Sequence, residues 1–101
     1  MSKAKVFVDG KIAGKKVVVF SKSYCPYCKK AKATLKKYIG EDEKDIIEID
    51  NDPDCDAIQQ YLGKLTGAKS VPRIFVNGKS IGGNDQLEEL ERKKELAVML
   101  K

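Results

Sequence analysis

Residues 17–35 read VVVFSKSYCPYCKKAKATL, and this stretch decides how the rest of the chain is interpreted. The apolar run within residues 16–21 is rich in β-branched side chains, which is typical of a strand buried on both faces. The apolar spacing that follows predicts a helix over residues 26–39. The thiols of Cys25 and Cys28 therefore lie where a strand is followed by a helix.

The first thiol of this pair is expected to cap the helix. A proline pushes the residue before it out of the α region, and Pro26 suits the first helical position, so Cys25 becomes the N-cap. The N–H groups of Tyr27 and Cys28 then point toward the Cys25 sulfur, which lies at the positive end of the helix dipole. Three lysines add positive charge nearby: Lys22, Lys29 and Lys30.

This environment separates the roles of the two thiols. A free cysteine has a pKa of about 8.5 and is mostly protonated at neutral pH. At a helix N-terminus within a Cys-X-X-Cys pair, the pKa of the first thiol falls to roughly 3.5–7.5. Cys28 lies one turn further into the helix, within disulfide reach of Cys25 but more buried. We therefore predict that Cys25 is the nucleophile and Cys28 the resolving thiol.

Composition limits the class of protein. The 101 residues are expected to form one domain over residues 1–101. No apolar run reaches the length of a membrane span, and no signal or transit peptide is indicated. Because a Cys-X-X-Cys pair suits redox catalysis in a reducing compartment, we expect a soluble cytoplasmic protein with no membrane partner.

Two further partner classes are disfavoured by composition. The net charge of +5 comes mainly from scattered lysines, and this pattern does not indicate a nucleic-acid surface. The chain has no histidine and only one cysteine outside the pair, whereas a structural zinc site needs four ligands. No metal is therefore expected.

Two more patterns complete a sheet. Residues 45–50 predict a second strand, and the strand, helix, strand spacing indicates a right-handed βαβ unit with parallel strands. Asn77 and Gly78 lie between two short apolar runs and indicate a hairpin of antiparallel strands. We therefore expect an α/β fold, with a mixed sheet of four strands flanked by helices on both faces. The cysteine pair would lie at the carboxyl end of the first strand, where such sheets bind ligands.

Helical patterns account for most of the remaining sequence. Asp52 and Pro53 are expected to be the N-cap and first residue of a helix. Its predicted apolar stripe consists of Ile58, Tyr61, Leu62 and Leu65. Residues 1–15 fit either a short helix or a strand. Residues 82–85 lead into another predicted helix, with Leu87 and Leu90 as apolar positions. Residues 95–100 fit a last helix, and whether Lys93 and Lys94 separate these two helices is left open.

Three features allow both a structural and a functional interpretation. The bond between Val71 and Pro72 fits either a turn proline or a cis peptide that leaves the backbone of Val71 free to pair. Residues 82–85 fit either a turn with a helix cap or a backbone site for a carboxylate. Cys55 lies between two acidic residues that favour its neutral form, so we interpret it as a passive thiol.

Taken together, the motifs resemble the dithiol class of glutaredoxins from residue 17 to residue 100. The resemblance rests on the order and spacing of Lys22, Cys25-Pro26-Tyr27-Cys28, Gln59, Leu65-Thr66-Gly67, Ser70-Val71-Pro72, Asn77-Gly78 and residues 81–85. It implies a thioredoxin-like fold with a cis bond before Pro72. It also implies a glutathione-dependent thiol–disulfide oxidoreductase that reduces protein–glutathione mixed disulfides and protein disulfides.

The same resemblance implies partners and residue roles. Glutathione would be the co-substrate, glutathione reductase an indirect partner, and the protein a monomer. Lys22 and Gln59 would contact the glycine carboxylate of glutathione, and the backbone of Val71, beside Pro72, would pair with its cysteine. Tyr27 would line the groove. Asn84 and Asp85, with the turn at Gly82 and Gly83, would hold the γ-glutamyl end. Two positions depart from the common family pattern: Ser70 replaces threonine, and Lys94 replaces glycine.

Three other functions compete with this interpretation. A thioredoxin-type reductase is disfavoured because no tryptophan precedes the cysteine pair. An iron–sulfur carrier, in which two chains share a cluster through Cys25 and two glutathiones, is disfavoured because Pro26 stiffens the loop. A binding module without catalytic activity is disfavoured because the sequence around Cys25 is expected to lower the pKa of its thiol.

Overall fold

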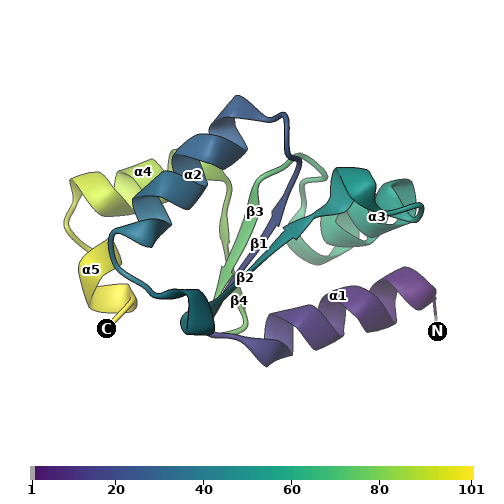
Figure 1. Ribbon diagram of the computed structural model, residues 1–101, viewed down its shortest axis with the longest axis horizontal. Helices are drawn as coiled ribbons and strands as arrows, with labels where there is room; N and C mark the ends of the chain where they lie inside the picture. The colour runs from purple at the N-terminus through teal and green to yellow at the C-terminus, as the bar shows by residue number, and fades with distance from the viewer. Residues whose placement is uncertain (1) are drawn as a thin grey trace.

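The computed structural model describes residues 2–101 and holds the predicted strands in one mixed sheet. Strands β1 (Val17–Ser21) and β2 (Lys44–Glu48) run parallel, as the βαβ interpretation predicted. Strand β3 (Arg73–Val76) lies antiparallel both to β1 and to β4 (Lys79–Gly82), which confirms the predicted hairpin. The strand order is β2-β1-β3-β4, so β1 and β3 form the centre of the sheet (Figure 1).

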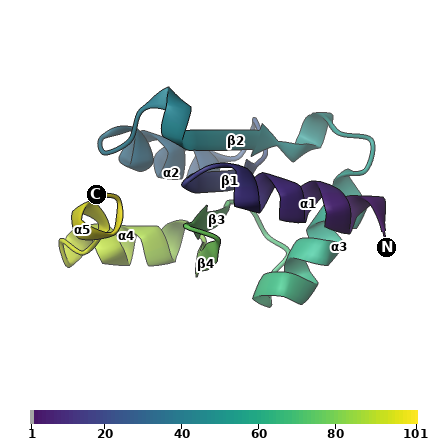
Figure 2. The ribbon, with the colours of Figure 1, turned by 90° about the horizontal axis from the view of Figure 1, so that it is seen from below.

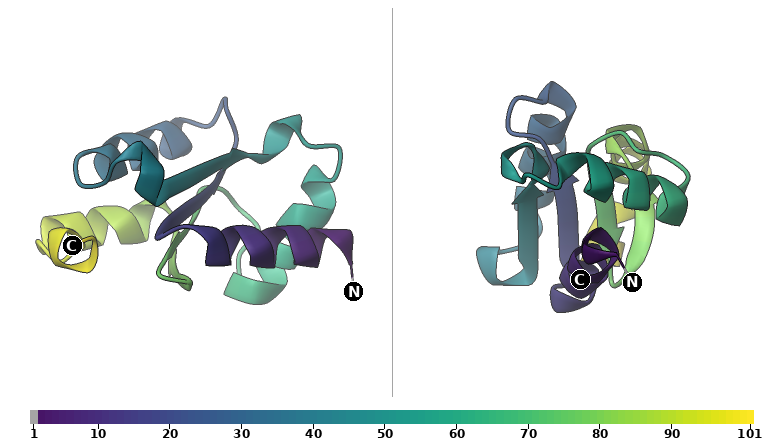
Figure 3. Two further views of the ribbon diagram at one scale, coloured as in Figure 1. Left: turned by 60° about the horizontal axis from the view of Figure 1, so that its bottom comes forward. Right: turned by 90° about the vertical axis from the view of Figure 1, so that its right-hand side faces the viewer.

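Helices cover both faces of this sheet, which confirms the expected α/β fold (Figure 2). One face carries α2 (Pro26–Lys36), α4 (Asn84–Arg92) and α5 (Leu96–Met99). The other face carries α1 (Lys3–Gly14) and α3 (Cys55–Thr66), which contact each other and cross at an angle, as Figure 3 shows. None of the helices in residues 2–101 combines the length and the apolar character that a membrane span requires.

The central position of β1 explains its uninterrupted apolar sequence. Val17 and Val19 pack into the core beneath α2 and α4, whereas Val18 and Phe20 face α1 and α3. Phe20 meets Phe75 of β3 edge to face, with ring centroids 5.9 Å apart. Because both faces of β1 are packed, the loop that leaves its carboxyl end starts from a fixed position.

Helix α3 begins later than the sequence predicted. The expectation placed the N-cap at Asp52 and the first helical residue at Pro53, but α3 starts at Cys55 with Asp54 as its N-cap. A side-chain turn causes the shift, because the N–H of Asp54 donates to Oδ1 of Asp52 at 2.8 Å. Short acidic side chains commonly compete with helical backbone bonds in this way.

Other predicted boundaries also shift. The first part of the chain, which fitted either a helix or a strand, forms α1, and Ser2 caps it by accepting from the N–H of Lys5. Helix α2 ends at Lys36, before the predicted residue 39. Strand β2 ends at residue 48 because the chain then turns into a short 3-10 helix, η2 (Ile49–Asn51); another, η1 (Glu41–Glu43), precedes β2. Leu65, predicted in the apolar stripe of α3, is 47% exposed.

The last two helices are separate, which answers the question left open by the sequence. Lys94 lies between them and has a φ of +63°, in the left-handed region. The N–H of Glu95 then reaches back to the carbonyl oxygen of Leu90 at 2.9 Å, which closes the turn. Helix α5 can therefore fold back beside α4 and cover the end of the core.

Candidate active site

Cys25 occupies the N-cap of α2, as the sequence predicted. Its backbone is extended, with φ −82° and ψ 119°, and Pro26 is the first helical residue. The N–H of Cys28 donates to Sγ of Cys25 at 3.4 Å. The sulfur thus takes the position in which the oxygen of a serine or aspartate caps other helices.

The balance of forces on Cys25 favours its thiolate. Burial by itself raises the pKa of this thiol, but hydrogen bonds from the Cys28 thiol and from the N–H groups of Cys28 and Tyr27 lower it. The positive charge of Lys32 lowers it further, and the net pKa lies below the ordinary value. The prediction of a low-pKa nucleophile is consistent with this environment.

The lysine that acts on Cys25 is not one of those expected. The sequence suggested Lys22, Lys29 and Lys30, whereas the cation that lowers the pKa of Cys25 is Lys32. Lys29 and Lys30 are exposed to solvent, which screens their charges. Lys32 is partly buried, one turn beyond Cys28 along α2, and so acts through a less polar medium.

Cys28 has the opposite character. Its side chain is fully buried, and burial raises the pKa of its thiol. The N–H of Lys22 and the hydroxyl of Ser21 partly offset this effect, whereas the neighbouring Cys25 adds to it. A buried thiol with a raised pKa behind one with a lowered pKa is the arrangement expected for a resolving cysteine.

A loop from the other half of the chain completes the site. The peptide bond between Val71 and Pro72 is cis, the isomer that the resemblance implied. The thiol of Cys25 faces the carbonyl oxygen of Val71 across 3.9 Å. The nucleophile and the backbone of this loop are therefore neighbours, although 46 residues separate them in the sequence.

An open cavity of about 380 Å³ lies beside this loop. Six of the predicted binding residues line it: Tyr27, Val71, Pro72, Gly83, Asn84 and Asp85. Lys22 and Gln59 do not line it. Gln59 is instead held by neighbours, because its Nε2 donates to the carbonyl oxygen of Lys69 at 3.0 Å. Assignment of these two residues to the glycine carboxylate thus stays a prediction.

Two cavity residues, Arg73 and Gln86, were not predicted from the sequence, and Ser70, which was named as a family landmark, was given no binding role. Arg73 is 9% exposed, and its Nε donates to the carbonyl oxygen of Pro72 at 3.1 Å. The Oε1 atom of Gln86 accepts from the N–H of Gly83 at 2.8 Å. A glutamine at the third helical position is a known capping signal, so Gln86 could have been found from the sequence.

Asn84 contributes an unpaired acceptor to the cavity wall. Its side chain is 8% exposed, and Oδ1 is a buried atom without a hydrogen-bond partner in residues 2–101. Buried polar atoms are usually paired, so this oxygen is a candidate acceptor for a donor group of a bound ligand.

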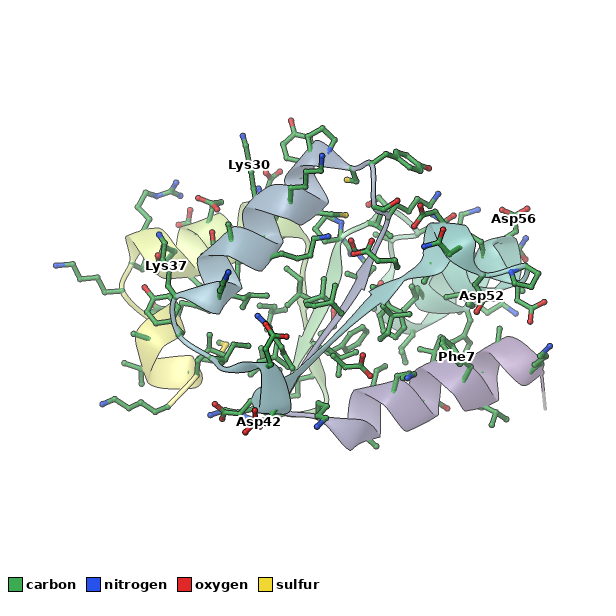
Figure 4. The ribbon with its side chains drawn as sticks, in the orientation of Figure 1. Phe7, Lys30, Lys37, Asp42, Asp52 and Asp56 are labelled. Carbon is green, nitrogen blue, oxygen red and sulfur yellow. The ribbon has the colours of Figure 1, made fainter. Side chains whose placement is uncertain are left out.

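The third cysteine lies apart from the pair. Cys55 is the first residue of α3, and its thiol donates to Oε1 of Gln59 across 3.7 Å. Figure 4 shows Asp52 and Asp56 at this end of α3, while Lys30 lies beside the amino end of α2. No three His, Cys, Asp or Glu side chains of residues 2–101 gather as a metal site requires, and the expected lack of a metal stays a prediction.

The two thiols define the class of this protein. One thiol has a lowered pKa and lies beside the loop that lines the cavity, and the other is buried behind it, so the molecule is a thiol–disulfide oxidoreductase. The sequence model of the glutaredoxin family matches residues 17–81. The chain belongs to the glutaredoxin family.

Individual relatives agree with this placement. Glutaredoxin-1 of Rhizophagus irregularis is 48% identical over 87 residues, which cover 86% of this chain and 84% of the relative. Oxidized glutaredoxin 2 of Chlamydomonas reinhardtii is 41% identical, with a TM-score of 0.90 over 97% of this chain and 91% of its own. A buckwheat glutaredoxin solved in complex with glutathione is 37% identical, with a TM-score of 0.90 over 96% and 86% of the two chains.

These similarities settle the fold and the general activity. The sheet and helices match solved glutaredoxin structures, which confirms the thioredoxin-like fold. The protein is a glutathione-dependent thiol oxidoreductase that acts through Cys25 and Cys28.

Proposed function

We propose that this glutaredoxin reduces protein–glutathione mixed disulfides and protein disulfides in the cytoplasm. The observation that carries the proposal is the pair of adjacent thiols with opposed pKa shifts, beside the loop that lines an open cavity. The pKa of Cys25 is lowered and that of Cys28 is raised. Cys25 is therefore the nucleophile in the first step, and Cys28 reacts only in the second. A reducing compartment keeps both in the thiol form that this mechanism requires.

The proposed glutathione position follows from the cavity wall. The backbone of Val71 pairs with the cysteine of the tripeptide, which places the glutathione sulfur beside Cys25. The γ-glutamyl end lies at the amino end of α4, where free N–H groups attract its carboxylate. Its ammonium group meets Asp85 and the unpaired Oδ1 of Asn84. Tyr27 covers the side of the groove.

The first step uses Cys25 alone. Its thiolate attacks the glutathione sulfur of a mixed disulfide, the protein thiolate leaves, and Cys25 becomes glutathionylated. The thiolate of a second glutathione attacks the glutathione sulfur that is bound to Cys25. This step releases the Cys25 thiolate and forms oxidised glutathione. We propose that glutathione reductase then reduces the oxidised glutathione.

Protein disulfides require both thiols. Cys25 attacks one sulfur of the substrate and forms a mixed disulfide with it. Cys28 then attacks Cys25, which releases the substrate and leaves a disulfide between the two cysteines. Two glutathiones reduce this bond. The protein acts as a monomer in this scheme, and size-exclusion chromatography with light scattering tests that point.

A glutathione-coupled assay with two variants tests the proposal. Cys25→Ser should abolish turnover of a glutathionylated protein, because the attacking sulfur is lost. Cys28→Ser should retain that turnover but lose reduction of a protein disulfide. Loss of both activities in Cys28→Ser would contradict the route that uses Cys25 alone, and failure of the wild-type protein to use glutathione would overturn the proposed function.

A further inference from the structure

Arg73 is a buried cation without a counter-ion. Its side chain is 9% exposed, and the bond from Nε to the carbonyl oxygen of Pro72 is the single hydrogen bond that its guanidinium makes within residues 2–101. None of the ion pairs formed by these residues includes Arg73. Because a charge removed from water is normally paired, this guanidinium is a candidate binding group for an anion.

The Nη groups of Arg73 are the donors left without a partner. A guanidinium has five N–H donors, and the bond to Pro72 uses only the one on Nε. In the part of the chain that the structure describes, Oδ1 of Asn84 is the one enclosed side-chain atom that lacks a partner, so the unpaired Nη groups are not enclosed. Since Arg73 lines the open cavity, these groups reach solvent there.

The guanidinium lies at the amino end of α4. A Cβ atom on Gly83, the N-cap of this helix, would lie 2.7 Å from Nη2 of Arg73. The first N–H groups of a helix have no partner within the helix, and they attract anions. Arg73 and the start of α4 therefore present positive charge to the same part of the cavity.

Acceptors lie next to these donors. Oδ1 of Asn84 is buried and unpaired, and Asp85 adds a carboxylate to the wall of the same cavity. A ligand that satisfies both sets has a carboxylate for Arg73 and an ammonium group for Asn84 and Asp85. A free α-amino-acid end carries these two groups on one carbon atom. In glutathione, the γ-glutamyl group has such an end.

We propose that Arg73 binds the α-carboxylate of the γ-glutamyl group and is a specificity-determining residue of the reaction. The inference rests on the function and the glutathione position proposed above, in which the carboxylate met only the amino end of α4. The glycine carboxylate lies at the other end of the tripeptide, beyond the cysteine that pairs with Val71. The preferred substrate is therefore a mixed disulfide whose small thiol carries a free α-carboxylate on its γ-glutamyl group.

A purely structural role for Arg73 is the alternative. The side chain also packs the cis-proline loop against the start of α4, so its removal changes the shape of the cavity. The two roles predict different results for Arg73→Gln. Packing alone predicts that all substrates react more slowly by the same factor. Carboxylate binding predicts a loss that is confined to substrates with the α-carboxylate.

The test measures how fast excess reduced protein releases a fluorescent peptide thiol from three mixed disulfides. The first contains glutathione. The second contains an analogue with a carboxamide in place of the γ-glutamyl α-carboxylate, and the third an analogue with a carboxamide in place of the glycine carboxylate. At about pH 6.5 the amino groups of all three are mainly protonated, so each analogue differs from glutathione by one charge. The wild-type protein should react roughly 10- to 100-fold faster with glutathione than with the α-carboxamide, the range for a hydrogen bond to a charged group.

Arg73→Gln should remove most of this preference. Its rate with the glutathione substrate should fall by roughly the same 10- to 100-fold, whereas its rate with the α-carboxamide should stay close to that of the wild type. The ratio of the rates with glutathione and with the glycine carboxamide should not change. Arg73→Lys keeps the charge but loses the planar pair of N–H donors, so it should retain only part of the preference.

Arg92→Gln is the matched control, because it removes the other arginine of the chain. Arg92 is the last residue of α4, its side chain is 69% exposed, and it pairs with Glu89. Loss of this exposed charge leaves the cavity wall intact, so the wild-type preference should persist. Circular dichroism melting confirms that each variant is folded.

The outcomes separate this inference from the function on which it rests. If the wild-type protein releases the peptide from the glutathione substrate no faster than free glutathione does, the proposed function fails. If the wild type reacts rapidly but Arg73→Gln slows all three substrates by one factor, or keeps the preference for the α-carboxylate, the role assigned to Arg73 is wrong. If Arg73→Gln does not fold, Arg73→Lys decides: an undiminished preference in that variant would also overturn the assignment.

Discussion

A Cβ atom on Gly83 would lie 2.7 Å from Nη2 of Arg73. The guanidinium of Arg73 thus fills the space that any larger residue at position 83 would need. The same Cβ would lie 3.2 Å from the carbonyl oxygen of Pro72, to which Nε of Arg73 donates. The buried arginine therefore packs the start of α4 against the cis-proline loop and joins two walls of the cavity.

Gly83→Ala should consequently disturb both walls. The added methyl group displaces a buried guanidinium and presses on the backbone of Pro72, and overpacking of this kind costs about 1–3 kcal/mol. The Michaelis constant for a glutathionylated substrate should also rise, because the cavity changes shape. Urea unfolding and steady-state kinetics measure the two effects.

Gly40→Ala is the control for this prediction. A Cβ at Gly40 meets no atom within 4 Å, and its φ of −85° suits any residue. Its free energy of unfolding should change by less than about 0.5 kcal/mol. Equal stability of the Gly83→Ala and Gly40→Ala variants would mean that the Arg73 side chain moves aside freely.

The charge on Lys32 should set the reactivity of Cys25 at acidic pH. Because this cation lowers the pKa of Cys25, Lys32→Gln should raise that pKa and shift the pH profile of iodoacetamide alkylation to higher pH. Alkylation at a pH below the midpoint becomes slower. Lys30→Gln removes a charge that is exposed and lies 5.6 Å from the ring centroid of Tyr27, so its profile should match the wild type. Equal shifts in both variants would contradict the assignment.

The hydrogen bonds between Asp50 and Ser23, in the loop before the cysteine pair, should depend on pH. Its carboxylate accepts from the hydroxyl and from the N–H of Ser23, the latter at 3.0 Å, and these bonds lower its pKa below the ordinary value of 3.8. Their stabilising contribution is complete above that ordinary value and is lost as pH falls through the lowered pKa. The Ser23 amide resonance should report this transition in NMR spectra.

The variant Asp50→Asn removes the titrating group from this loop. The pH-dependent change at the Ser23 amide should vanish, and hydrogen exchange of that amide should become faster at neutral pH. A Ser23 resonance that still titrates in Asp50→Asn would mean that another carboxyl group holds the loop.

Lys94→Gly should stabilise the protein. Lys94 has a φ of +63°, a conformation that costs an ordinary L-residue about 1–2 kcal/mol and that glycine adopts without strain. Because glycine also loses more chain entropy on folding, the expected gain is about 1 kcal/mol in the free energy of unfolding. Chemical denaturation measures it.

Asn77→Gly provides the comparison. Asn77 also has a positive φ, 52°, but asparagine tolerates this region well, so its gain should be smaller than that of Lys94→Gly. Destabilisation by Lys94→Gly would show that the lysine side chain contributes contacts that outweigh the backbone strain.

Local sequence signals predicted those parts of the fold that depend on neighbouring residues. The extended Cys25 followed by Pro26 fixed the helix cap, and Asn77 with Gly78 fixed the hairpin. The predicted start of α3 was wrong because the side chain of Asp52 accepts a hydrogen bond from the N–H of Asp54. The spacing of apolar residues along a helix gives no information about such a bond. Closeness in sequence named Lys22, Lys29 and Lys30 as the cations near Cys25, whereas Lys32 is the one that lowers its pKa, because closeness in sequence carries no information about burial.

The sequence by itself determined which thiol caps a helix and which follows it one turn later, because backbone sterics around a proline act over a few residues. Only the tertiary structure decided what surrounds these thiols. The cis-proline loop and the Arg73 guanidinium reach the site through strand pairing and helix packing. Those contacts join residues far apart in the chain, and their geometry depends on sheet register and on the burial that the whole core creates.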